Sequence, residues 1–188
     1  MRKLLIPIVA TAVLALLAPT AAQASAVPAS IPTKSFRVVK PMQVVGFDRE
    51  VAAANGYEIR VNNEGQEYSV PVGSDASVTP SNTVTGNCGS SYVQITPVGN
   101  RKALIQTGFT VYTGAVDFDW VVHVIDNYGV SNKTWGGALA FRSSWVGTNN
   151  FTSSGTGYAS AEVTWGVAFL WDGTICFSLG PFASTYIY

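Results

Sequence analysis

Residues 159–179 read ASAEVTWGVAFLWDGTICFSL, and this stretch carries the clearest structural pattern in the chain. From Ala159 to Trp171 every second residue is apolar or aromatic, which is the period of a β-strand with one buried face. The next dipeptide, Asp172-Gly173, is strongly favoured in two-residue hairpin turns. The stretch therefore predicts a long strand, a tight turn and a returning strand that carries Cys176 into the same sheet.

Similar runs, separated by turn residues, fill the chain between Cys88 and this hairpin. The clearest is 116–125, in which apolar and polar residues alternate. Many short strands with glycine-rich turns and no helical period favour an all-β fold, either a single antiparallel β-sandwich or a partly closed barrel. The other strands are expected at 92–96, 103–107, 109–112 and 138–146, with a polar loop at 148–157.

A short helix and a β-hairpin are predicted before the sheet. Asp48 is a suitable N-cap for a helix that ends near Asn55, and Gly56 suits the position after the helix. Alternation on both sides of a polar turn at 62–65 predicts the hairpin. Residues 25–45 contain three prolines and predict an extended arm with little structure of its own.

The N-terminus has the features of an export signal. Arg2 and Lys3 precede an apolar run at 4–17, and small residues at 22–24 form a cleavage site. Cleavage is expected after Ala24, and a second suitable site follows Ala26. The apolar run is shorter than the roughly 20 residues that cross a bilayer. The organisation is therefore a signal peptide at 1–24, an arm at 25–45 and one β-rich domain at 46–188, in a secreted, extracellular protein without a membrane span.

The chain has two cysteines, Cys88 and Cys176. Cysteines outside the cytoplasm are usually oxidised, so the pair predicts one disulfide that closes most of the domain into a loop. With a disulfide and a single histidine, the chain has no ligand set for zinc. Asp117, Asp119 and Asp126 supply too few oxygens for calcium. We predict no metal and no cofactor.

The charge balance argues against a nucleic-acid partner. Removing Arg2 and Lys3 from the 11 basic residues leaves 9 against 11 acidic residues, a net charge of −2. Nucleic-acid binding proteins need a basic face. The charged fraction is only 12%, about half the usual share, and aromatic residues also make up 12%. This composition is typical of a compact extracellular β-domain.

Few residues suit catalysis. A hydrolase would use His123 as its base, with Asp119 or Asp126 as the nearby carboxylate, and no Gly-x-Ser-x-Gly motif is present. A histidine in the middle of a strand is more often structural, because catalytic groups usually lie on loops. Asp117 and Asp119 lie two positions apart on one strand face. Any solvent-exposed strand face with polar residues at alternate positions gives such a pair. We therefore favour a non-catalytic protein and keep the hydrolase as the alternative.

Exposed aromatic residues are the remaining candidates for a binding site. Three tryptophans lie on apolar strand faces and are expected in the core: Trp120, Trp165 and Trp171. Four other aromatic residues stand beside glycine or hydroxyl residues near turns. A flat ring gives contact area at a low entropy cost, so these four are predicted to bind an extracellular carbohydrate or peptide. The competing interpretation is that they cap the core. They are Trp135, Trp145, Tyr128 and Tyr158.

Three features together resemble small secreted actinobacterial proteins of unknown function: the export signal, residues 46–57 and the cysteine stretch at 86–92. The resemblance covers most of the mature chain. It implies secretion and a single domain, and no activity follows from it.

Overall fold

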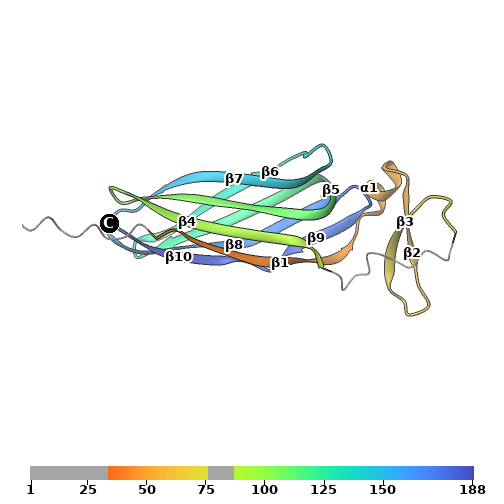
Figure 1. The fold of residues 1–188 in the computed structure, drawn as a ribbon, viewed down its shortest axis with the longest axis horizontal. Helices are drawn as coiled ribbons and strands as arrows, with labels where there is room; N and C mark the ends of the chain where they lie inside the picture. Colours follow the sequence, from red (N-terminus) through yellow and green to blue (C-terminus); the bar gives the residue numbers. More distant parts are fainter. Residues whose placement is uncertain (1–33, 76–86) are drawn as a thin grey trace, which may run out of the picture. The chain divides into compact units, whose positions relative to one another are not determined.

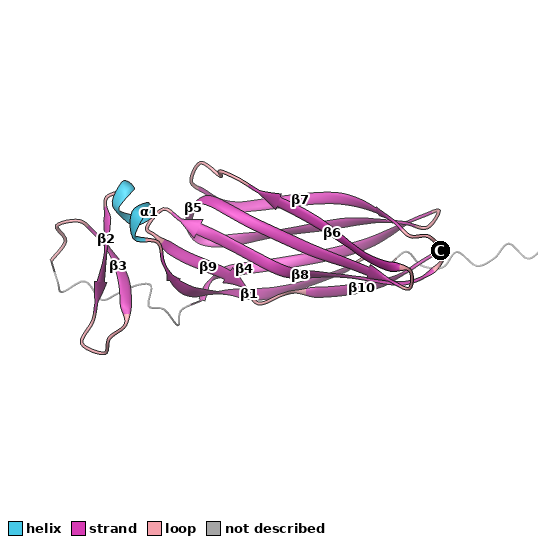
Figure 2. Ribbon diagram, turned by 180° about the vertical axis from the view of Figure 1, so that it is seen from behind, coloured by secondary structure: helices cyan, strands magenta, loops and turns pink. Residues whose placement is uncertain are grey.

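Strands make up 72% of the described chain and helix only 4%, as the alternating sequence predicts (Figure 2). The structure is a computed structural model that describes residues 34–75 and 87–188. The predicted signal peptide and the first part of the arm lie outside these residues. The elements are β1 (Phe36–Phe47), α1 (Arg49–Ala54), β2 (Tyr57–Val61), β3 (Glu67–Pro71), β4 (Asn87–Gly99), β5 (Lys102–Asp126), β6 (Gly129–Gly136), β7 (Arg142–Thr152), β8 (Gly157–Leu170), β9 (Thr174–Ser178) and β10 (Phe182–Ile187).

Five of the described strands form a closed circuit of hydrogen-bonded neighbours (Figure 1). β5 pairs with β4, β4 with β1, β1 with β9, β9 with β8, and β8 with β5. β10 adds to β8, while β6 and β7 each pair only with β5 among the described strands. Every one of these pairings is antiparallel. The predicted antiparallel sandwich or partly closed barrel is confirmed, and β6, β7 and β10 are its edge strands.

The long strand β5 runs through both layers of the sheet. The sequence predicted three separate strands here, with breaks at Gly108 and Gly114. The chain is continuous, because these glycines allow close approach: a Cβ on Gly108 would lie 2.2 Å from the Trp145 carbonyl oxygen. The two halves of β5 face each other across the core, since the Trp120 indole N–H donates to the Thr107 hydroxyl at 2.9 Å.

The predicted helix and hairpin are both present. The Asp48 carboxylate accepts hydrogen bonds from the backbone N–H groups of Glu50 and Val51, each at 3.0 Å, and so caps α1. Gly56 takes φ +78° directly after Asn55, as its place behind the helix predicts. β2 and β3 form a separate two-stranded sheet. The backbone N–H of Asp48 donates to the carbonyl of Gly173, which ties this unit to the turn between β8 and β9.

The expected arm at 25–45 needs correction over its described part. Residues 36–45 belong to β1, which pairs with β4 on one edge and β9 on the other. Met42 and Val44 point into the core, so this strand buries apolar surface. The prediction of an arm, which was based on the three prolines, missed this burial. Pro41 is tolerated because the pairing with β9 begins only at Met42.

The disulfide between Cys88 and Cys176 is confirmed. It joins β4 to β9, the two neighbours of β1, with 6.0 Å between the Cα atoms. Both cysteines are buried. The bridge spans 88 residues of sequence.

The set of β8 residues that faces the core changes part-way along the strand, which the sequence did not predict. Val121 lies opposite Trp165, but its neighbour Val122 lies opposite Val163, so Thr164 forms a bulge. A strand slip of one residue exchanges the two faces. Trp165 therefore points outward and is 50% exposed, so its predicted core position is wrong. Trp120 is fully buried, as predicted.

Two boundaries near the open edges also differ from expectation. Trp135 lies within β6, opposite Trp120, and not in a turn. The first half of the polar stretch 148–157 continues β7 to Thr152, because its threonine and asparagine side chains face solvent while Phe151 is buried.

Candidate functional site

Trp135 and Trp145 lie together between the open edges of β6 and β7. Their ring centroids are 5.8 Å apart, and both side chains are partly buried against the core. Trp145 also lies 4.4 Å from the Phe118 ring and 5.9 Å from that of Trp120. The two indoles therefore fill the gap that the missing β6–β7 pairing leaves, which agrees with the capping interpretation.

The predicted tyrosines lie elsewhere. Tyr128 is in the turn between β5 and β6 and packs beside Gly155, where a Cβ would lie 2.0 Å from the phenol oxygen. Tyr158 is 70% exposed on β8, with its ring centroid 5.3 Å from that of Tyr186. The structure does not bring the four predicted residues into one site.

Trp145→Ala should lower the free energy of unfolding by about 2 to 3 kcal/mol, because the variant removes a partly buried indole from an aromatic cluster. Guanidinium denaturation measures this loss. The matched control is Tyr158→Ala, which removes an exposed ring and should change stability by about 0.5 kcal/mol. A Trp145→Ala protein as stable as the wild type would instead favour a surface-binding role.

His123 lies near the C-terminal end of β5, opposite Asn132 on β6 and Glu162 on β8. Its ring is partly exposed, and no hydrogen bond within the described chain joins it to a serine hydroxyl or a carboxylate. Asp119 is four residues away along the strand, about 13 Å at the usual strand rise. These positions do not form a nucleophile–base–carboxylate arrangement.

The other proposed partner of His123 has a structural role. One oxygen of Asp126 accepts hydrogen bonds from the N–H groups of Tyr128 and Gly129, at 2.8 and 2.9 Å. The other oxygen accepts from the Ser153 hydroxyl at 2.6 Å. Asp126 therefore fixes the β5–β6 turn and its contact with the β7–β8 turn.

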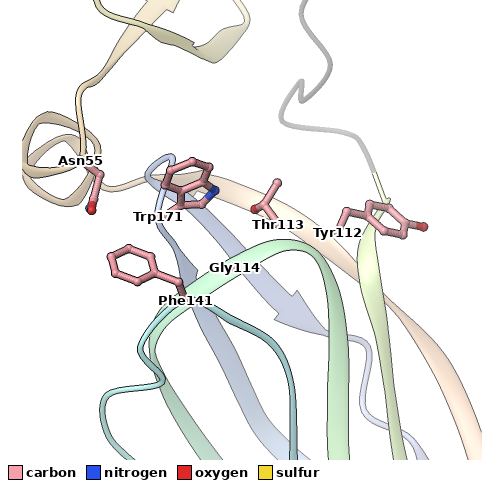
Figure 3. A pocket seen from close by; sticks show the side chains of 6 residues that line it. All are labelled: Asn55, Tyr112, Thr113, Gly114, Phe141 and Trp171. Atoms are coloured by element: carbon pink, nitrogen blue, oxygen red, sulfur yellow. The ribbon is translucent and has the colours of Figure 1, made fainter.

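A hollow on the described surface lies where β5 bends between its two halves (Figure 3). Its volume of about 540 Å³ is within the range of small-molecule sites. Four segments contribute: the end of α1, the bend of β5, the loop 137–141 and the β8–β9 turn. We call it the Trp171 hollow. Its lining residues are Asn55, Tyr112, Thr113, Gly114, Phe141 and Trp171.

Trp171 forms an aromatic wall of the Trp171 hollow. Its backbone N–H donates to the Gly114 carbonyl at 3.0 Å, which fixes the β8–β9 turn against β5. The ring lies between Tyr57 and Phe141, with centroid distances of 5.3 and 6.3 Å and edge-to-face geometry. Trp171 remains 37% exposed, so its predicted core position is wrong: it packs on the hairpin unit and leaves one side open.

Phe141 reaches the hollow through a strained turn. Ala140 and Phe141 take φ of +47° and +65°, and the Arg142 N–H closes the turn on the Leu139 carbonyl at 3.2 Å. Left-handed backbone is costly for residues other than glycine and often marks functional positions. Gly114 permits the approach, since a Cβ there would lie 2.4 Å from the Phe141 carbonyl oxygen.

The polar groups of the Trp171 hollow are uncharged. The Thr113 hydroxyl oxygen is shielded from solvent and has no hydrogen-bond partner among the described residues. The Asn55 amide nitrogen donates to the Val51 carbonyl at 2.8 Å, so its oxygen remains available as an acceptor. None of the six lining residues carries a carboxylate, ammonium or guanidinium group. Such a site suits non-covalent binding of a neutral ligand.

Sequence reasoning missed this hollow for identifiable reasons. Trp171 follows the apolar alternation of β8, so it was assigned to the core. Phe141 carries no turn signal, because alanine and phenylalanine are not usual left-handed residues. The Asp172-Gly173 turn beside Trp171 was the one signal that an exposed ring stands at the sheet end.

Metal-ligand clusters, membrane-spanning helices and similarity to known proteins do not assign a function to this chain. No cluster of three or more metal-ligating side chains occurs among the residues that the structure describes. Within the same residues, no helix has the length and hydropathy to cross a membrane. No protein-family model, curated protein or solved structure matches the chain.

Proposed function

We propose that this protein is a secreted, non-catalytic binding module, extracellular or associated with the cell envelope, that holds a neutral carbohydrate or peptide ligand in the Trp171 hollow. The observation that carries the proposal is the pairing of Trp171 with a strained Phe141 around uncharged polar groups. Binding sites typically combine apolar and aromatic walls with a few polar groups that fix orientation.

Export rests on the N-terminal signal and on the disulfide. A buried disulfide between Cys88 and Cys176 is compatible with an oxidising compartment outside the cytoplasm. The signal sequence at 1–24 is the more direct support.

The alternative, a hydrolase that uses His123, has less support. A general base needs to lie within hydrogen-bond reach of the proton that it removes, directly or through one water. His123 lies on a sheet face with Asn132 and Glu162 as its cross-strand neighbours, and Asp126 holds a turn. None of the described residues that line the Trp171 hollow is a histidine or carries a carboxylate.

Trp171→Ala is expected to weaken ligand binding by about 1 to 3 kcal/mol, because it removes an aromatic wall that the ligand contacts. Isothermal titration with neutral sugars, soluble polysaccharides and short peptides measures the affinity. Trp165→Ala is the matched control: it removes a tryptophan of similar exposure from the outer face of β8. If both variants bind like the wild type while the wild type binds a ligand, the Trp171 hollow is not the site.

A further inference from the structure

A second hollow adjoins the Trp171 hollow. Tyr112 lines both, and its ring is 69% exposed. Figure 3 shows Tyr112 beyond Thr113 on the side away from Phe141, so the aromatic residues follow one another along the bend of β5. The second hollow has a volume of about 270 Å³ and lies over β1, β4 and β5. We call it the Ser90 hollow.

The floor of the Ser90 hollow carries two hydroxyl groups, those of Ser90 and Thr110. Pro41, Ser90, Thr110 and Ser144 lie opposite one another on β1, β4, β5 and β7, and Ser144 lies beside the hollow. Opposed residues in antiparallel strands point to the same face, and all four are exposed here. Asn87 stands at the same hollow; its amide oxygen accepts the Gly89 N–H at 3.0 Å, which leaves the amide NH₂ free to donate.

The joined surface is longer than one sugar ring. Gly114 is four positions after Thr110, so the floor along β5 extends over roughly 13 Å at the usual strand rise. Aromatic groups dominate at the Trp171 end, whereas the Ser90 end combines hydroxyl and amide groups with the apolar side chains of Val39 and Pro41. Lys40 is the one charged residue among the described residues that line the two hollows.

We propose that the two hollows form one groove for an oligosaccharide of uncharged sugars, with one unit on Trp171 and the following units along Tyr112 toward Ser90 and Thr110. This inference rests on the proposed function and names its ligand class. Sugar rings present C–H groups to aromatic faces and hydroxyl groups to polar side chains, and the groove supplies both. An extended peptide binds sheets by adding to a free strand edge. At Thr110 both edges of β5 are already paired, with β4 and with β7.

The test is isothermal titration of the full secreted chain with β-1,4-linked glucose and N-acetylglucosamine oligosaccharides of increasing length, from one unit upward. In at least one series, wild-type affinity should rise at least tenfold between one unit and about four. Tyr112→Ala should abolish most of this rise. Trp171→Ala should weaken binding at every length.

Two controls keep the result interpretable. Tyr128→Ala removes a tyrosine of similar exposure away from the groove and should change neither affinity nor its dependence on length. Tyr112→Phe keeps the ring and should retain most of the length dependence. Thermal melting checks that Tyr112→Ala is folded, as its exposed position predicts.

The outcomes separate this inference from the proposed function. If affinity does not depend on oligosaccharide length in either series but is lost in Trp171→Ala, the groove is contradicted and the binding site in the Trp171 hollow is supported. Binding of peptides at Trp171 with no binding of either sugar series overturns the ligand class alone. Sugar binding that Trp171→Ala leaves unchanged overturns both.

Discussion

Trp120→Ala should lower the free energy of unfolding by about 3 to 5 kcal/mol, the range for deleting a large buried aromatic side chain. Trp120 is fully buried, and its ring lies 5.4 Å from that of Phe109. Its N–H also bonds the Thr107 hydroxyl, which in turn donates to the Tyr92 carbonyl at 2.8 Å. The Trp120 ring joins both halves of β5. Its removal therefore costs both the transfer free energy of the buried ring and the free energy of the cavity that remains.

The control for this prediction is a second tryptophan that is exposed and not buried. Trp165→Ala should cost only about 1 kcal/mol, because Trp165 lies on the outer face beside Phe177. Trp120→Phe should cost less than Trp120→Ala, since most of the ring volume remains. Chemical denaturation monitored by circular dichroism gives all three values. Equal losses for Trp120→Ala and Trp165→Ala would contradict the bulge at Thr164.

Removal of the disulfide should have an effect of similar size. For a bridge that spans 88 residues, the chain-entropy estimate is about 4 to 5 kcal/mol, and native bridges in small secreted domains contribute about 2 to 5 kcal/mol. The double variant Cys88→Ala/Cys176→Ala should therefore melt on the order of 10 °C lower than the wild type. Alanine is preferred to serine, because both positions are buried and a hydroxyl there would lack a partner.

Reductant provides the internal check on this prediction. It should lower the melting temperature of the wild type toward that of the double variant and leave the double variant unchanged. Mass spectrometry of freshly secreted protein should show two fewer hydrogens than the reduced form. Two free thiols in that material would refute the bridge.

The candidate site shows where sequence patterns stop being informative. Trp135 and Trp145 looked exposed, because glycine and serine neighbours are typical of turns. Their burial depends on β6 and β7 failing to pair, which leaves space that only large rings fill. Trp171 looked buried from its strand pattern, yet the chain turns back at Gly173 and leaves the ring at the sheet end. Local sequence does not record which neighbours will cover a side chain.

The sequence by itself determined the all-β antiparallel class, the capped helix at Asp48, the hairpin that follows it and the pairing of Cys88 with Cys176. Each depends on local periodicity, on local turn chemistry or on the presence of two cysteines. Only the tertiary structure decided that residues 102–126 form one strand, that β1 belongs to the sheet, that the Thr164 bulge turns Trp165 outward, and that Trp171 meets Phe141. These outcomes depend on contacts between residues distant in sequence, where packing outweighs the preference of any single segment.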